Sequence, residues 1–204
     1  MQEKVERRAT YADIEAAHPL LVAELIDGRL VTHPRPTGRH SHSHFRLASV
    51  LGPPLDEAIG GPGGWRFLTE PELHLGADVC VPELAGWRVE RIPGGPAPDP
   101  LAPAKIRLVP DWVCEVLSPS TEKYDRHEKR DIYAEAGIGH LWLVDPRLGV
   151  VEAFVLSDRA WKLAGTYSGE DMVRIAPFQA IEFGLGRLWP PPRIPVGTPR
   201  INES

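Results

Sequence analysis

The first thirty residues show a hydrophobic pattern that predicts one helix and a turn. Thr10 and Asp13 stand at the spacing of a capping box, which begins a predicted helix. We extend this helix through residues 20–25, with a disturbance at Pro19, because apolar side chains continue at helical spacing. The pair Asp27-Gly28 predicts a turn, and a short strand follows over residues 29–32.

A second helix and two strands are predicted in the middle of the chain. Between residues 40 and 59 apolar side chains recur every three or four positions, which is helical spacing. Pro53 and Pro54 interrupt this pattern, so we expect a kink or two helical pieces. Beyond a glycine-rich break, residues 65–75 and 78–89 are predicted to form two strands.

The second half of the chain carries the clearest strand pattern. Residues 105–117 end in a run that is apolar on both faces, as in a central strand. A helix is predicted over residues 122–136, ending at Gly137, and a buried strand over 141–144. The remaining predicted strands are a hairpin (150–156 and 160–167) and two short strands near Val173 and Ile181. The sequence therefore predicts an α/β (α+β) fold with a mixed sheet and a β-rich C-terminal part.

Composition narrows this picture to a single globular domain. Of 204 residues, 22 are proline and 19 glycine, which excludes a helical bundle or coiled coil. We expect one domain over residues 10–188, with extended tails at 1–9 and 189–204. No apolar run is long enough to cross a membrane, and the N-terminus lacks the apolar core of a signal peptide. Since Cys80 and Cys114 both lie in apolar runs, we expect a cytoplasmic protein without disulfides.

An acidic side chain interrupts the predicted central strand. Glu115 stands among apolar residues, where a carboxylate loses hydration and needs a partner such as a metal ion or a cation. On the following helix Asp125, Lys129 and Tyr133 are spaced four apart, so they share one face. This face either brings Lys129 over the strand end near Glu115, or is a solvated stripe with an Asp–Lys pair. For Glu115 the simpler alternative is a buried salt bridge.

Two further acids and a group of histidines are candidates for the same chemistry. Glu83 follows Pro82 in a strand pattern, and proline there indicates a strand edge or a bulge that aims a side chain; a solvated strand end is the alternative. Glu24 has apolar neighbours and is expected to point inward. In a helix only His40 and His44 of the three alternating histidines share a face, and one histidine beside a carboxylate or phosphate is favoured over a zinc site.

The order of these motifs resembles a known family. Residues 110–121, the helix face of Asp125, Lys129 and Tyr133, and residues 141–146 are similar to the Uma-two family of restriction endonucleases, once called domain of unknown function 820. Upstream, residues 24–28 resemble the family's entry from helix to strand, and His40 falls where the family has a histidine. Residues 81–87 resemble its "PD" strand. The resemblance covers residues 10 to 185.

The resemblance implies a fold and a site. The family shares the PD-(D/E)XK nuclease core, a restriction-endonuclease-like mixed central β-sheet flanked by helices, which binds a divalent ion through acids on neighbouring strands. Carried over, Glu83 and Glu115 are catalytic acids, and Leu117 occupies the position of the usual lysine. Lys129 on the next helix then replaces that lysine. The implied metal ligands are Glu24, Glu83 and Glu115, Asp111 is an implied outer acid, and Mg²⁺ or Mn²⁺ is the implied cofactor.

The implied function is metal-dependent hydrolysis of DNA phosphodiester bonds, and two alternatives stay open. Glu83 replaces the family's aspartate, so the chain could instead be a catalytically impaired nuclease fold that binds DNA or protein. It could also be another metal hydrolase that uses His40 or His44. The expected partner is DNA, and no membrane partner is expected. Apolar strand edges allow a homodimer but do not require one.

Charge is the main objection to DNA as a partner. The net charge is −5, so affinity for DNA would need a local basic patch. The candidates for such a patch are Arg35, Arg39, Arg46, Arg88, Arg91, Lys105, Arg107, Arg126 and Arg130.

Overall fold

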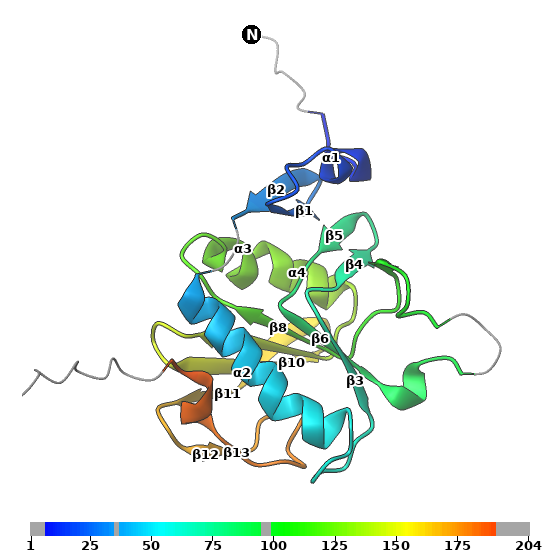
Figure 1. The fold of residues 1–204 in the computed structure, drawn as a ribbon. Helices are drawn as coiled ribbons and strands as arrows, with labels where there is room; N and C mark the ends of the chain where they lie inside the picture. The colour runs from blue at the N-terminus through cyan, green and yellow to red at the C-terminus, as the bar shows by residue number, and fades with distance from the viewer. Residues whose placement is uncertain (1–6, 35–36, 95–98, 191–204) are drawn as a thin grey trace, which may run out of the picture.

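The structure is a computed structural model that describes residues 7–34, 37–94 and 99–190 (Figure 1). It contains two mixed sheets, one of six strands and one of five, together with a two-stranded ribbon. Of the predicted tails at 1–9 and 189–204, residues 1–6 and 191–204 lie outside the described residues, as does Arg35 of the proposed basic patch.

The six-stranded sheet has the order β11-β10-β9-β8-β6-β3. The pair β8–β9 is parallel and the other pairs are antiparallel. Its strands are β3 (Trp65–Thr69), β6 (Leu84–Arg88), β8 (Trp112–Val116), β9 (His140–Asp145), β10 (Val150–Ser157) and β11 (Ala160–Ser168). The central position of β8 explains why its sequence is apolar on both faces.

The five-stranded sheet has the order β2-β1-β5-β4-β7, with only β4–β7 parallel. Its strands are β1 (Val22–Ile26), β2 (Arg29–His33), β4 (Glu72–Leu75), β5 (Asp78–Cys80) and β7 (Lys105–Ile106). The ribbon near the C-terminal end pairs β12 (Met172–Val173) with β13 (Phe183–Gly184).

Four α-helices cover these sheets in the described part of the chain. They are α1 (Tyr11–Glu15), α2 (Gly38–Leu55), α3 (Glu122–Arg126) and α4 (Glu128–Glu135), and two short 3₁₀ helices are η1 (Val89–Arg91) and η2 (Leu185–Leu188). Figure 1 shows α2, in cyan, lying across the six-stranded sheet. None of the described helices combines the length and the apolar character that crossing a membrane requires.

Two hydrophobic clusters flank the six-stranded sheet. Trp112, Cys114 and Val116 of β8 pack in the cluster that contains the apolar face of α2. Val113 and Leu117 pack in the other cluster, which contains residues of α4 and of the five-stranded sheet. Alternation along β8 therefore sends Glu115 toward the α4 side of the sheet.

The chain passes between the two sheets at three short segments, each of which contains a proline. β3 leads to β4 through Glu70-Pro71, β5 leads to β6 through 81–83, and β7 leads to β8 through 107–111. Proline has no N–H to donate to a strand ladder, so these positions are natural ends of pairing. The predicted strands 65–75, 78–89 and 105–117 are each corrected to two strands that belong to different sheets.

The prediction that the first helix continues through residues 20–25 is wrong. α1 ends at Glu15, and Glu24 lies in strand β1 instead. The chain turns at Asp27 and Gly28, which both have positive φ (51° and 70°), and β1 pairs with β2 as a hairpin. The apolar spacing over these few residues fits a strand as well as a helix. The tight turn at Asp27-Gly28 allows the strand to pair as a hairpin, and this pairing decides between the two.

Two other helix predictions need smaller corrections. α2 is one continuous helix, because Pro53 and Pro54 fall in its last turn. The predicted helix over 122–136 is divided at His127, whose φ and ψ (−124° and −87°) are not helical. The predicted mixed α/β class and the β-rich C-terminal part are confirmed, and the structure adds a second sheet.

Candidate active site

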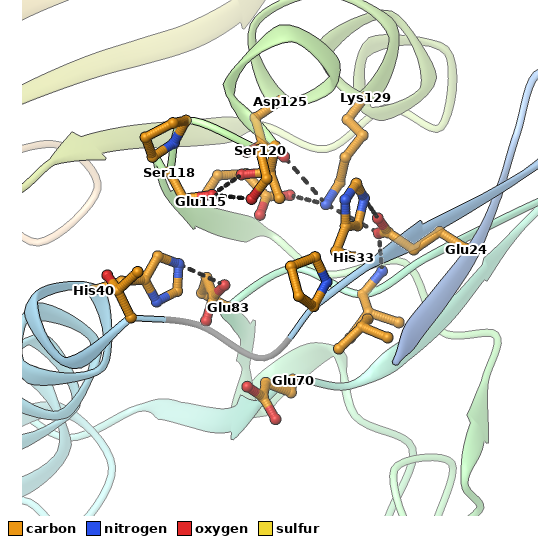
Figure 2. A pocket seen from close by; sticks show the side chains of 16 residues that line it. Glu24, His33, His40, Glu70, Glu83, Glu115, Ser118, Ser120, Asp125 and Lys129 are labelled. Carbon is orange, nitrogen blue, oxygen red and sulfur yellow. Dashed lines mark hydrogen bonds and ion pairs between the residues drawn. The ribbon is translucent and has the colours of Figure 1, made fainter. Parts of the chain in front are cut away.

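A pocket of about 260 Å³ opens where the two sheets, α2 and the α3–α4 segment meet (Figure 2). It is lined by polar side chains from all of these elements: Glu24, His33, His40, Glu70, Glu83, Glu115, Ser118, Ser120, Thr121, Asp125 and Lys129. The structure therefore brings the predicted residues Glu24, Glu83, Glu115, Asp125, Lys129 and His40 to one place.

Lys129 is the buried centre of this pocket. Its Nζ lies 2.8 Å from Oε1 of Glu115, 3.0 Å from Oε1 of Glu24 and 3.5 Å from Oδ1 of Asp125. All four side chains are at most 4% exposed, so the charges are shielded from water. Although the helix is divided at His127, Asp125 and Lys129 still lie on the same side. This side faces the interior near Glu115, and is not the solvated stripe that was the alternative.

Glu115 is held by two residues of α4. Besides Lys129, the hydroxyl of Tyr133 donates a hydrogen bond of 2.5 Å to Oε1 of Glu115. Tyr133 stands one turn beyond Lys129, so both reach back over the end of β8. Both contacts use Oε1, which leaves Oε2 of Glu115 as the oxygen that these two residues do not engage.

Three buried carboxyl groups share the single ammonium group of Lys129. Burial raises the pKa of Glu115 well above its ordinary value, and the charge of Lys129 opposes only part of that effect. Burial also raises the pKa of Asp125. The neighbouring carboxylates Glu115 and Glu24 outweigh burial and raise the pKa of Lys129, so this lysine stays charged. The cluster therefore carries more acidic groups than basic ones.

Glu24 is fully engaged by hydrogen-bond donors. Its Oε1 accepts the backbone N–H of Val81 at 2.7 Å as well as contacting Lys129, and its Oε2 lies 3.2 Å from Nε2 of His33. Burial would raise the pKa of Glu24, but Lys129 and these donors outweigh burial and lower it. The sequence did not indicate His33 as a site residue. Glu24 pairs with Val31, and His33 lies two residues beyond Val31 on the same face of β2. A predicted hairpin over 22–33 would therefore have placed His33 near Glu24.

Glu83 faces two histidines of α2. Nε2 of His40 lies 2.9 Å from Oε1 of Glu83, and Nδ1 of His44 lies 3.1 Å from Oε2. Burial alone would raise the pKa of Glu83, but the two histidines outweigh it and hold that pKa at about 2. The sequence predicts one histidine beside a carboxylate, and the structure places two, His40 and His44, beside Glu83.

Asp111 is not brought to this pocket. It precedes β8, where its carboxylate accepts the backbone N–H of Arg88 at 2.9 Å and pairs with Arg91 at 2.8 Å. Arg126 of the proposed basic patch is likewise occupied, since it pairs with Glu152 at 2.6 Å. These pairs reduce the positive charge that the patch can offer to a phosphate backbone.

The loop between β8 and α3 adds hydroxyl groups to the pocket wall. The hydroxyl of Ser118 lies 2.9 Å from that of Ser120 and 3.1 Å from that of Thr121. These groups can donate hydrogen bonds to a bound oxyanion. The sequence pattern of this loop does not distinguish such a role from that of a short connection.

Potential ion ligands gather most closely on the α2 side of the pocket. Among the described residues, only His44, Glu70 and Glu83 bring three ligand atoms within 4.8 Å of one another. The implied set of Glu24, Glu83 and Glu115 lines the same pocket without meeting that distance.

Comparison with known proteins matches the chain to a family model and to solved structures. The family Uma2, described as "Putative restriction endonuclease", matches residues 8–186. A crystal structure from Anabaena variabilis ATCC 29413, titled as "a putative nuclease belonging to DUF820", matches with a TM-score of 0.66 and 21% identity over 81% of this chain and 88% of that chain. At that identity the likeness concerns the fold. The curated proteins contain no match.

Proposed function

The chain belongs to the Uma2 family, and we propose that it is a divalent-metal-dependent endonuclease that hydrolyses DNA phosphodiester bonds in the pocket around Lys129. The observation that carries this proposal is the charge of the buried cluster. Glu24, Glu115 and Asp125 all contact one ammonium group, at 2.8–3.5 Å. Buried carboxylates in excess of their cations are costly unless protons or a further cation neutralise them, and a divalent ion would do so without protonation.

The donor set fits a hard divalent ion. Carboxylate oxygens without sulfur ligands are the donors that Mg²⁺ and Mn²⁺ prefer. Within the described part of the chain, both oxygens of Glu24 are hydrogen-bonded, whereas Oε2 of Glu83 and Oε2 of Glu115 are not. Glu83 and Glu115 would therefore hold the ion. When bound, Mg²⁺ or Mn²⁺ supplies charge that polarises a phosphodiester and acidifies a coordinated water.

Glu24 takes a different role in this proposal from the one that the family resemblance implied. With Oε1 contacting Val81 N–H and Lys129, and Oε2 contacting His33, it is a positioning residue for Lys129. The same contacts hold the five-stranded sheet against α4, because Glu24 lies in β1.

Lys129 stabilises negative charge and does not act as a base. Its raised pKa keeps the ammonium group protonated, so it can donate hydrogen bonds to a phosphate oxygen or to the attacking water. Tyr133 fixes the carboxyl group of Glu115 through its hydroxyl. The hydroxyls of Ser118 and Ser120 stand at the pocket wall, where they can bind the non-bridging oxygens of the phosphate.

One observation favours the second candidate function, a nuclease fold that binds DNA or a protein without cleaving it. Glu83 replaces the family's aspartate and is turned to His40 and His44. A carboxylate bound in this way to two histidines is less available to an ion shared with Glu115. Glu83→Asp shortens the side chain by one methylene and withdraws it from the histidines, so this variant separates the two candidates.

The test is cleavage of supercoiled plasmid by purified protein in Mg²⁺ and, separately, in Mn²⁺. We expect cleavage by the wild-type chain, a loss of about 100-fold or more in Glu115→Gln and Lys129→Ala, and no change in the control Lys123→Ala, whose side chain is exposed on α3. Cleavage that survives both site variants would contradict the proposal. Cleavage gained only in Glu83→Asp would support the non-cleaving candidate.

A further inference from the structure

A second group of ligands stands beside the Lys129 cluster, at the N-terminal part of α2. His44 comes from the second turn of α2, Glu70 from the crossing between β3 and β4, and Glu83 from the crossing between β5 and β6. Their ligand atoms lie within 4.8 Å of one another. Figure 2 shows Glu70 below Glu83, on the side of the pocket away from Lys129.

The backbone holds the two glutamates side by side. The N–H of Glu70 donates to the carbonyl of Glu83 at 3.1 Å, at the end of the β3–β6 ladder where Thr69 pairs with Leu84. Both residues lie in proline-containing crossings, so no further ladder continues past them. The position of each carboxylate is therefore set by the fold, while the exposed side chain of Glu70 can rotate toward a ligand.

Oε2 of Glu83 is the unsatisfied atom of this group. It is buried, and among the described residues it receives no hydrogen bond of good geometry, although Nδ1 of His44 lies 3.1 Å away. Oε1 of the same carboxylate is already bound by the 4%-exposed His40. Carboxylates that bind a metal ion are themselves hydrogen-bonded by neighbouring groups, and His40 is such a neighbour for Glu83.

The spacing suits one ion. With bonds of about 2.1 Å, neighbouring ligands on an ion are about 3.0 Å apart in octahedral and about 3.4 Å apart in tetrahedral geometry. Nδ1 of His44 and Oε2 of Glu83 are already at 3.1 Å. Rotation of the exposed Glu70 side chain can close the remaining gap.

From these contacts we infer that His44, Glu70 and Glu83 form a binding site for a divalent first-row transition ion such as Zn²⁺. An imidazole with two carboxylates favours such an ion over Mg²⁺, which prefers oxygen ligands alone. The site lies beside the Lys129 cluster and shares Glu83 with it. It does not require the proposed nuclease activity, because ion binding is measured without DNA.

The test is a titration of chelator-treated, metal-free full-length protein with Co²⁺, followed by visible ligand-field absorption. We expect one equivalent of Co²⁺ to bind, to be displaced by Zn²⁺ and to resist a large excess of Mg²⁺. His44→Gln and Glu70→Gln should each weaken binding by about tenfold or more. His42→Gln, on the same helix but outside the ligand group, is the matched control and should bind as wild type does.

The variants also separate this inference from the proposed function. Binding that is unchanged in both His44→Gln and Glu70→Gln, or absent from the wild-type protein, would overturn the inference. Binding lost in Glu115→Gln but kept in His44→Gln would also overturn it, because the ion would then lie on the Lys129 side, and the proposed function would stand. Binding lost in His44→Gln and Glu70→Gln but kept in Glu115→Gln would support the inference even if no variant cleaved DNA.

Discussion

At the scale of residues, Lys129 is the side chain on which the site depends. A lysine that is 3% exposed keeps its charge only because carboxylates surround it. In return it offsets the charge of Glu24, Glu115 and Asp125, which come from three different elements. The proposed function and the stability of the fold therefore both depend on this ammonium group.

Replacement of Lys129 by methionine should destabilise the protein strongly. The variant keeps the side-chain volume but leaves buried carboxylates without a cation, a situation that costs about 3–5 kcal/mol. Urea unfolding of the metal-free protein measures this loss. Lys123→Met, at an exposed position of α3, is the control and should change the free energy of unfolding by less than about 0.5 kcal/mol. Equal stabilities of the two variants would contradict the account of the cluster.

Several of these residues can be predicted from sequence patterns alone. Alternation along 112–117 sends Glu115 to one face, and the four-residue spacing of Asp125, Lys129 and Tyr133 places them on one helical side. The proposed role of Glu70 could not be predicted, because an exposed glutamate before a proline looks like an ordinary loop residue. Its place beside Glu83 depends on the pairing of β3 with β6, which are separate in sequence.

At the scale of elements, the strands that cross between sheets position the site. Hydrophobic patterns locate the strands over 65–75, 78–89 and 105–117, but they do not show that each divides between two sheets. Pro71, Pro82 and Pro110 mark the divisions, and each was compatible with a strand edge or a bulge. Whether such a proline ends a strand or forms a bulge depends on which strands pair on either side of it. Those pairings join distant parts of the chain, so the local sequence does not reveal them.

Strand β6 is packed too tightly to accept a larger residue at Gly86. A Cβ there would lie 2.8 Å from Cε1 of Phe67 and 3.2 Å from Cε3 of Trp112. Gly86→Ala should lower the free energy of unfolding by about 1–3 kcal/mol, because these aromatic rings belong to the core. Gly38→Ala, whose Cβ would meet nothing within 4 Å, is the control, and chemical denaturation compares the two. A Gly86→Ala variant as stable as the control would show that this strand can shift.

At the scale of the whole molecule, the pocket is a junction between two sheets. Glu24 belongs to the five-stranded sheet, Glu115 to the six-stranded sheet, and Lys129 to the helix that packs with both. The mixed α/β class could be predicted from the order of strands and helices. The second sheet could not, because its pairings, such as Leu25 with Val79, join segments far apart in the sequence.

A divalent ion bound at this junction should stabilise the whole fold. At a Mg²⁺ concentration of about 100 times the dissociation constant, the free energy of unfolding should rise by about 2.7 kcal/mol. Thermal unfolding with and without Mg²⁺ measures the effect. We expect the shift to disappear in Glu115→Gln and to persist in Glu57→Gln, an exposed acid used as the control. A shift of the same size in both variants would mean that Mg²⁺ acts elsewhere on the protein.

The proposed function requires a divalent ion at the acidic cluster around Lys129. Its most direct test is anomalous diffraction from crystals of the protein soaked in Mn²⁺, recorded near the manganese absorption edge. We expect an anomalous peak in contact with the carboxylate of Glu115 and with Glu83. A Mn²⁺-soaked crystal without a peak at Glu115, from protein that cleaves DNA in the same Mn²⁺ solution, would contradict it.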